Sequence, residues 1–294
     1  RARTAGPLRA RGPLVRHTSA AEHARRIEVC RERIAEGECY QANLAHRFTR
    51  ELDAAPRDLY ARLRARNRAP YMGYLEGAWG ALLSASPELL LDYAGGVART
   101  RPIKGTLPRL EDPVADREQR ARLLASEKDR AELAMIVDLE RNDLGRIAEW
   151  GGVRVEGFPS LHSYARVHHL MADVVATPRA GTTALDALAA LFPGGSITGA
   201  PKLRSMELIA ELEGEGRGFF CGALGMLDLR DRACFNILIR SLAWRPRPEL
   251  GPSAGEVSFR VGGGITWSSE AAAEDDETLA KARSLAEALE SSVE

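Results

Sequence analysis

The chain has 294 residues, with 41 basic and 41 acidic side chains and no net charge. This balance gives no electrostatic support for binding to nucleic acid or to a membrane surface. No apolar run approaches the roughly 20 residues of a transmembrane helix, and no signal-peptide core is present, so we predict a cytoplasmic protein.

The first half of the chain begins with an arginine-rich stretch over residues 1–19, which we interpret as a linker or trimmed N-terminal region. We predict one domain over residues 20–294. The apolar spacing of Ile27, Cys30 and Ile34 predicts an amphipathic helix. The elements expected here are helices over 20–35 and 56–66, strands over 39–48, 73–83 and 89–93, a loop over 84–88, and two helices within 112–144.

The second half predicts strands followed by helices and then a run of consecutive strands. We expect strands over 153–155 and 167–175, helices over 183–191 and 201–212, strands over 219–229, 234–244 and 256–261, and a helix over 270–290. Arg230 and Asp231 are typical of a turn between two of these strands. Consecutive antiparallel strands with separate helices indicate an α+β fold.

Lysine and cysteine usage adds two observations. Only four of the 41 basic residues are lysine, at positions 104, 128, 202 and 281. Unlike arginine, lysine can lose its proton and act as a nucleophile or base, so a retained lysine indicates either such a role or chance. The four cysteines form no Cys-x-x-Cys pair, which disfavours a zinc site and favours reduced thiols.

Two short segments carry candidate catalytic groups. Pro102 and Gly105 bracket Lys104, so the loop is stiff and holds the lysine in place. An amine needs partial desolvation or a nearby cation to be nucleophilic near neutral pH. A surface turn with a solvated lysine is the alternative. Glu88 follows Pro87 at the edge of a strand and is a candidate general acid if it is buried; a capping segment is the alternative.

Two glutamates and two glycine-rich segments suggest an anion site. Glu132 and Glu277 each lie four residues from a lysine, a spacing typical of surface ion pairs on a helix. The functional alternative is that both bind one Mg²⁺, which prefers carboxylates, water and substrate oxygens. Residues 194–202 open a helix whose amides attract anions, and residues 262–264 allow close approach of a ligand to the backbone. Tight turns are the alternative for both segments. With Arg240 and Lys281, these groups suit a dicarboxylate.

The order of these segments resembles that of the chorismate-utilising enzymes, over roughly residues 20–290. This family includes anthranilate synthase component I, aminodeoxychorismate synthase component I, isochorismate synthase and salicylate synthase. The matching segments are Gly37 to Leu44, Ser86-Pro87-Glu88, Pro102 to Thr106, Lys128 to Glu132, Met135 to Leu139, Arg141 to Arg146, Pro193 to Lys202, Gly262 to Ile265 and Glu277 to Lys281.

The resemblance implies a fold of two large, mostly antiparallel sheets packed as a sandwich, with helices outside. It implies a role for each matching residue. Glu132 and Glu277 match magnesium ligands, and the metal holds the ring carboxylate of chorismate. Glu88 matches the general acid for the C4 hydroxyl, and His169 the histidine near C4. The substrate-binding positions that we carry over are Gln41, Thr106, Thr198, Phe220, Arg240, Gly262, Gly263 and Lys281.

Two positions distinguish members of the family. Salicylate and isochorismate synthases have a lysine where this chain has Gln41, and anthranilate synthases usually have alanine at the position of Lys104. The resemblance therefore implies an aminodeoxychorismate synthase component I with Lys104 as nucleophile. Its ammonia would come from a glutamine amidotransferase, separate or fused, for p-aminobenzoate and folate synthesis. Anthranilate synthesis and a catalytically silent chorismate-binding module are the alternatives. Phe220 replaces a common tyrosine, so one hydroxyl contact is missing.

Overall fold

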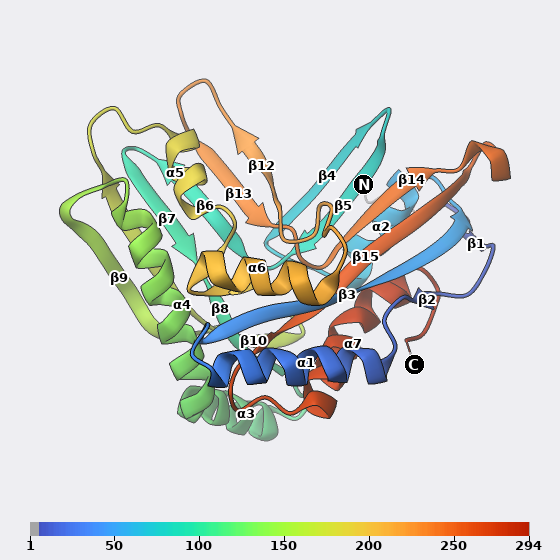
Figure 1. Cartoon of the computed structure of the whole chain (residues 1–294). Coiled ribbons are helices and arrows are strands. Elements are labelled where there is room, and N and C mark those ends of the chain that lie inside the picture. The colour runs from blue at the N-terminus through green and yellow to red at the C-terminus, as the bar shows by residue number, and fades with distance from the viewer. Residues whose placement is uncertain (1–5, 294) are drawn as a thin grey trace. The chain divides into compact units, whose positions relative to one another are not determined.

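The computed structural model describes residues 6–293, which divide into two compact units. Unit 1 contains the described residues up to Pro87, then Leu203–Gly222 and the residues from Leu238 onward. Unit 2 contains Glu88–Lys202 and Ala223–Ile237. The chain colours of Figure 1 show that each unit combines segments far apart in the sequence.

Unit 1 is built on an antiparallel sheet whose longest pairing joins β3 (Gln41–Asp53) and β15 (Ala254–Ile265). Their register runs continuously from Ala42 opposite Ile265 to Asp53 opposite Ala254. The strand order is β1 (Arg9–Ala10), β3, β15, β14 (Ser241–Pro246), β5 (Gly80–Ser86) and β4 (Tyr71–Gly77). The short strand β2 (Val15–Arg16) also pairs with β3.

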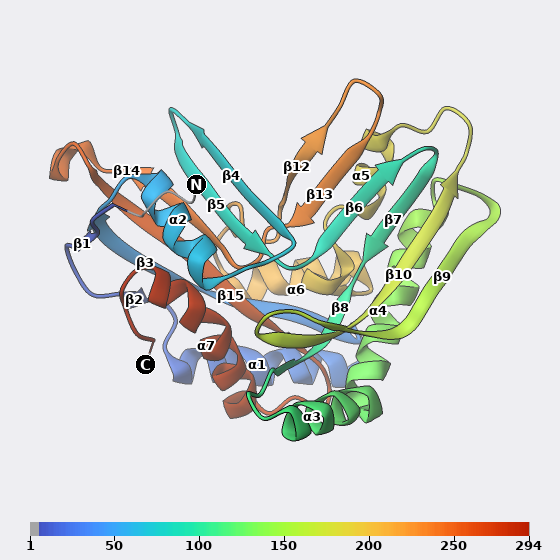
Figure 2. The same cartoon turned by 180° about the vertical axis from the view of Figure 1, so that it is seen from behind.

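Four helices belong wholly or mostly to unit 1: α1 (Ala20–Ala35), α2 (Pro56–Arg66), α6 (Lys202–Glu213) and α7 (Ala271–Ala288). Two apolar clusters hold them to the sheet, because burying apolar side chains is the main favourable term in folding. The first cluster packs α2 and α7 (Figure 2) on the sheet and includes Phe48, Leu59, Leu83, Val257 and Leu285. The second packs α1 and α6 and includes Ile27, Cys30, Leu44, Leu208 and Ile265.

Unit 2 contains a seven-stranded antiparallel sheet. Its order is β12 (Ala223–Leu227), β13 (Ala233–Ile237), β6 (Leu89–Ala94), β7 (Val97–Arg101), β10 (Val167–Pro178) and β8 (Ile103–Pro108), with β9 (Ala148–Ser163) also paired to β10. Its helices are α3 (Pro113–Ala125), α4 (Glu127–Gly145) and α5 (Ala184–Leu191). The remaining short elements of the chain are β11 (Gly199–Ala200) and the 3₁₀ turns Gly195–Ile197 and Pro248–Leu250.

The long helix α4 lies along β8, β9 and β10 (Figure 1). Its start is fixed by Ser126, which also ends α3. The Ser126 hydroxyl accepts a hydrogen bond from the backbone N–H of Asp129. Such a cap satisfies one of the free amides of the first turn, so α4 begins at a defined residue.

The predicted α+β class with antiparallel sheets is confirmed, and two helices have the predicted bounds, 20–35 and 56–66. The predicted pair of helices within 112–144 and the turn at Arg230-Asp231 are confirmed as well. The packing of the two sheets as a sandwich concerns the placement of the units and stays a prediction.

Three predicted elements are wrong. The strand over 73–83 is the hairpin of β4 and β5, which turns at Ala78 and Trp79 and re-enters the sheet at Gly80, whose φ of +128° favours glycine. The strand over 234–244 is β13 and β14 in different sheets, and Arg240 at the break has φ +51°. The loop around Lys104 is the strand β8, because Gly105 bends the backbone without ending the pairing.

The predicted linker also contains structure. Residues 9–10 and 15–16 form β1 and β2 and pair with β3, so this part of the chain belongs to unit 1. The predicted boundary at residues 19 and 20 stays a prediction. Among the described residues, no helix has the length and apolar character needed to cross a bilayer.

Candidate functional site

The predicted site residues fall into two groups, one in each unit. We call the set in unit 2 the lysine group: Glu88, Lys104, Thr106, Glu132, His169 and Thr198. We call the set in unit 1 the glycine group: Gln41, Phe220, Arg240, Gly262, Gly263, Glu277 and Lys281. Each group is described by itself.

Lys104 lies on β8 and its ammonium contacts α4. The Lys104 Nζ is 3.6 Å from Glu132 Oε2, and both side chains are largely buried. Gly105 makes this approach possible, because its φ is +77° and a Cβ there would lie 2.9 Å from Asp129 Cγ on α4. Lys128 lies 3.9 Å from Glu132 on the same helix and is mostly exposed. The structure therefore brings the candidate nucleophile beside one candidate metal ligand.

His169 and Thr106 are paired across β10 and β8. The Thr106 hydroxyl lies 2.8 Å from His169 Nδ1, so the two side chains are hydrogen-bonded. The register of the two strands shifts between His169 and Leu170. The Tyr164 ring packs against the imidazole at 5.7 Å between centroids. These contacts fix the orientation of the imidazole.

Glu88 immediately precedes β6 in the chain and is buried, with 4% of its surface exposed. Its Oε1 accepts a hydrogen bond from the backbone N–H of Ile103 at 3.3 Å, one residue before Lys104. The burial that we required of a general acid is therefore present. Thr198 is also buried, and its hydroxyl donates to the carbonyl of Gly194 at 2.9 Å, so it closes the glycine-rich turn.

Sequence reasoning missed two buried acids on α4, Glu140 and Asp143. Burial raises the pKa of both, and the Glu88 carboxylate adds to the shift at Glu140. Lys202 Nζ donates to Asp143 Oδ2 at 2.6 Å, which opposes the shift at Asp143. The missed signal is helical spacing, since both acids fall on the face that carries Ile136 and Leu144.

The glycine group is organised around Lys281 on α7. Its Nζ donates to the carbonyl of Gly262 at 2.8 Å and lies 2.8 Å from Glu277 Oε1. Arg240 Nη1 donates to the carbonyl of Lys281 at 3.2 Å. Burial lowers the pKa of the Arg240 guanidinium, and the Glu277 carboxylate opposes this shift. Four of the seven predicted residues are therefore linked to one another.

The other members of this group have local packing roles. A Cβ at Gly262 would lie 2.5 Å from the carbonyl oxygen of Leu44, so glycine is required where β15 pairs with β3. Gln41 is fully buried, and its carbonyl accepts a hydrogen bond from Ser205 at 2.9 Å. Phe220 lies beside the Arg217 guanidinium, 5.7 Å from Cζ to the ring centroid.

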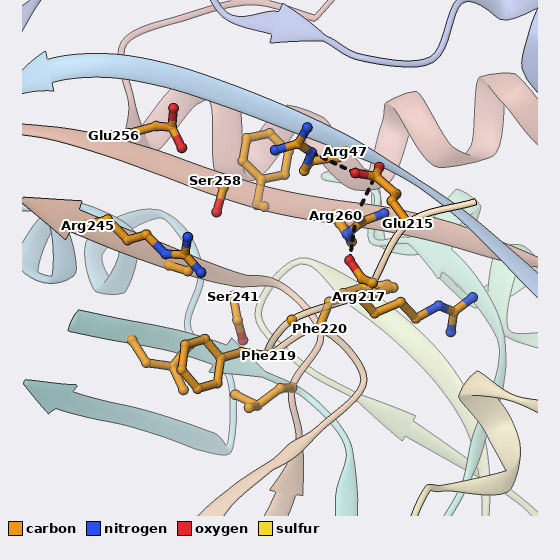
Figure 3. Close-up of a pocket in the computed structure, with 16 residues that line it drawn as sticks. Arg47, Glu215, Arg217, Phe219, Phe220, Ser241, Arg245, Glu256, Ser258 and Arg260 are labelled. Carbon is orange, nitrogen blue, oxygen red and sulfur yellow. Dashed lines mark hydrogen bonds and ion pairs between the residues drawn. The ribbon is translucent and has the colours of Figure 1, made fainter. Parts of the chain in front are cut away.

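Unit 1 also contains a pocket of about 160 Å³, shown in Figure 3. Arg47 and Arg260 both contact Glu215, at 3.3 and 2.9 Å, and Arg260 also donates to the carbonyl of Gly216. Phe220 is the one predicted site residue in its lining. The lining of this pocket does not include the candidate nucleophile, the candidate acid or the candidate metal ligands.

A buried cluster of His23, His46 and Asp275 also has the composition of a metal site. Arg16 donates to both oxygens of Asp275, and His23 Nδ1 lies 2.6 Å from one of them. Burial lowers the pKa of His46 to about 3, so its imidazole is neutral. The guanidinium already neutralises the carboxylate, so the arrangement suits a structural role that ties β2 to α1 and α7.

The chemistry of Glu132 and Glu277 fits Mg²⁺, which binds carboxylates while retaining water or substrate oxygens. The Glu132 side chain is 18% exposed and its lysine contacts are 3.6 and 3.9 Å, longer than hydrogen bonds. The Glu277 side chain is 58% exposed. The Glu277 side chain is therefore open to solvent, and the Glu132 side chain keeps a small exposed part. The prediction that they bind the same ion stays a prediction.

Two proteins of known activity match this chain at the same sequence identity. The chain is 43% identical over 274 residues to aminodeoxychorismate synthase component 1 of Klebsiella aerogenes, covering 93% of this chain and 59% of that protein. It is also 43% identical over 270 residues to anthranilate synthase component 1 of Streptomyces coelicolor, covering 92% and 51%. The chain thus spans between half and two thirds of the length of these relatives. Its sequence identity to the two proteins is the same, although their names give them different activities.

Solved structures of related enzymes have the same fold as this chain. Anthranilate synthase component I from Streptococcus pneumoniae superposes with a TM-score of 0.83 at 33% identity, over 96% of this chain and 60% of that one. The menaquinone-specific isochorismate synthase from Escherichia coli, at 22% identity, shares the fold with a TM-score of 0.81 over 96% of this chain and 63% of that one. The family model for chorismate binding enzymes matches residues 3–287, so the chain belongs to the chorismate binding enzyme family.

Proposed function

We propose that the chain catalyses the Mg²⁺-dependent amination of chorismate at C4, giving 4-amino-4-deoxychorismate, with ammonia from a glutamine amidotransferase partner. The observation that best supports this proposal is the position of Lys104 on β8. Its Nζ lies 3.6 Å from Glu132 Oε2, and the preceding residue, Ile103, donates its backbone N–H to Glu88. The resemblance implies alanine at the position of Lys104 in anthranilate synthases. The lysine therefore favours amination at C4 over amination at C2.

The proposed reaction uses Lys104 and Glu88 in turn. The Lys104 amine, after losing its proton, attacks C2 of the ring. The C4–O bond breaks with its electron pair on oxygen, and Glu88 donates a proton so that water leaves. Ammonia then adds at C4 and the lysine is expelled from C2. The contact of Thr106 with His169 orients an imidazole beside β8 for the C4 side of the ring.

Mg²⁺ held by Glu132 and Glu277 would supply positive charge for the ring carboxylate of chorismate. Within unit 1, Lys281 and Arg240 add cationic groups next to Gly262. Cations and backbone amides are the groups that stabilise carboxylates. The glycine group therefore supports recognition of an anionic substrate.

The test is mass spectrometry of the product formed from chorismate, Mg²⁺ and ammonium by the full chain. We expect a product that retains the enolpyruvyl group. The lyase that makes p-aminobenzoate should then convert this product to p-aminobenzoate. Lys104→Ala should reduce this activity by about 100-fold or more, as expected for loss of a covalent nucleophile. Lys128→Ala is the matched control, because Lys128 contacts the same glutamate from an exposed position.

The second candidate is amination at C2 with release of pyruvate, because an anthranilate synthase component is equally similar in sequence. Anthranilate with free pyruvate would establish this reaction and would remove the proposed role of Lys104. Full C4 amination by Lys104→Ala would also refute that role. Chorismate binding without any product would favour the silent binding module.

A further inference from the structure

A serine, a histidine and an aspartate form a connected series of hydrogen bonds in unit 2. Ser163 ends β9, His168 lies opposite it on β10, and Asp116 lies in the first turn of α3. The Ser163 hydroxyl oxygen is 2.8 Å from His168 Nδ1, and His168 Nε2 is 2.9 Å from Asp116 Oδ1. The proposed amination of chorismate uses none of the three. These are the residue types that make up an activated serine nucleophile.

The contacts of Asp116 fix which nitrogen of His168 carries the proton. Asp116 Oδ1 accepts a hydrogen bond from the backbone N–H of Leu110 at 2.9 Å, and Oδ2 accepts one from Arg109 Nη2 at 3.2 Å. These hydrogen bonds, the Leu110 contact first, lower the pKa of the Asp116 carboxyl group from 3.8 to about 2. The group is therefore ionised at neutral pH and can only accept hydrogen bonds. A neutral His168 imidazole thus carries its proton on Nε2, and Nδ1 is an acceptor.

This tautomer determines the direction of the contact with Ser163. Because His168 Nδ1 is an acceptor, the Ser163 hydroxyl donates to it, and both lone pairs of the serine oxygen are left for other contacts. Ser163 is exposed, whereas His168 is fully buried and Asp116 is 7% exposed. An accessible hydroxyl is therefore hydrogen-bonded to a base that a buried carboxylate orients. This is the arrangement that activates a serine for attack on a carbonyl group.

We propose that Ser163 is a nucleophilic serine that takes an acyl group from activated acyl esters, with His168 as general base and Asp116 as a positioning residue. The Ser163 oxygen attacks the carbonyl carbon of the ester while its proton moves to His168 Nδ1. The bond between that carbon and the leaving oxygen then breaks with its electron pair on the leaving oxygen, which takes the proton from His168. The products are an O-acyl serine and an alcohol. This activity is independent of the amination of chorismate.

The test is incubation of the full chain with p-nitrophenyl acetate, followed by mass spectrometry of its peptides. Two serines are internal references. Ser160 Oγ also lies near a histidine, 3.1 Å from His162 Nε2, but it donates to the carbonyl of Met171. Ser268 is exposed, and its Oγ contacts a hydroxyl group. A general base contributes about 100-fold or more to a rate, so Ser163 should be acetylated about 100-fold faster than either reference.

Equal acetylation of Ser163 and of either reference would overturn the proposal, because exposure or a neighbouring imidazole would then explain the reaction. Ser163→Ala should abolish the fast release of p-nitrophenol, and unchanged release would overturn it as well. This comparison involves an exposed residue, so it does not depend on a change in the core.

Asp116→Ala tests the positioning role. It removes the acceptor that holds His168 Nε2–H, so acetylation of Ser163 should fall about 100-fold, the contribution of an oriented base. Acetylation of Ser268 should stay unchanged. A fall at both serines, or at neither, would refute the role of Asp116. The comparison of serines within the unmutated chain decides the proposal even if Asp116→Ala does not fold.

Discussion

Replacing Gly105 by alanine tests how β8 places Lys104 beside α4. Gly105 has φ +77°, in the left-handed region that is unfavourable for residues with a Cβ. The new methyl group would lie 2.9 Å from Asp129 Cγ and 3.0 Å from Asp129 Cβ. Alanine therefore adds both backbone strain and a clash with the helix that carries Glu132.

The backbone strain and the steric clash each have a known typical cost in folding free energy. The left-handed backbone costs an alanine about 1–2 kcal/mol, and overpacking in a tight contact typically costs about 1–3 kcal/mol. We therefore expect Gly105→Ala to lower the free energy of unfolding by about 2–5 kcal/mol. Gly151→Ala is the matched control in the same unit, because Gly151 has φ +72° with no atom within 4 Å of the added Cβ. It should cost only the backbone part.

Urea unfolding of both variants, followed by circular dichroism, gives the difference directly. A second variant, Asp129→Ala, removes Asp129 Cγ and Oδ1, so it should reduce the cost of Gly105→Ala by roughly 1 kcal/mol in a double-mutant cycle. If Gly105→Ala is no more destabilising than Gly151→Ala, β8 does not approach α4 as closely as described. The proposed placement of Lys104 by Gly105 would then be refuted.

Two further predictions concern buried charges in unit 2. Lys202→Met should lower the free energy of unfolding by about 3 kcal/mol, because it leaves the buried Asp143 without its cation. Lys128→Met is the control: it breaks an exposed ion pair and should lower the free energy of unfolding by less than about 1 kcal/mol. Equal losses for the two variants in urea unfolding would contradict this prediction. Hydrogen bonds from the backbone N–H of Leu110 and from His168, with Arg109, lower the pKa of Asp116 from 3.8 to about 2. Its ionised form therefore adds stability that is present above pH 3.8 and is lost as the pH falls through about 2. Asp116→Asn should accordingly destabilise the chain more at pH 6 than at pH 3, and an equal effect in urea unfolding at both values would refute this assignment.

The helices were predictable from the sequence to a greater degree than the strands. The spacing of Ile27 and Cys30 and the glycine at 37 bound the first helix at the residues where the structure has it. The strands over 73–83 and 234–244 were each predicted as one because their apolar residues continue across the break. The breaks depend on backbone conformation at Gly80 and Arg240, and such turns leave only weak signals in a single sequence.

Candidate site residues could be predicted where they lie in short sequence motifs that resemble those of a known family. The lysine in Pro102–Thr106 and the glutamates at 88 and 132 do lie together in unit 2. Only the element that carries Lys104 was predicted wrongly, as a loop, because a Pro and a Gly around the lysine are also compatible with a bent strand. Glu140 was missed because it falls between two of the matching segments, Met135 to Leu139 and Arg141 to Arg146, although its position on an apolar helical face predicts burial.

The division of the chain has a consequence for biosynthesis. The polypeptide passes between the two units at residues 87/88, 202/203, 222/223 and 237/238. The sheet of unit 2 lacks β13 until residue 237 has been made, and β3 of unit 1 waits for β15, more than 200 residues later. Nascent chains therefore expose unpaired strands through most of translation, and chaperones that shield strand edges should associate with them. Neither unit corresponds to a continuous fragment that can be expressed alone.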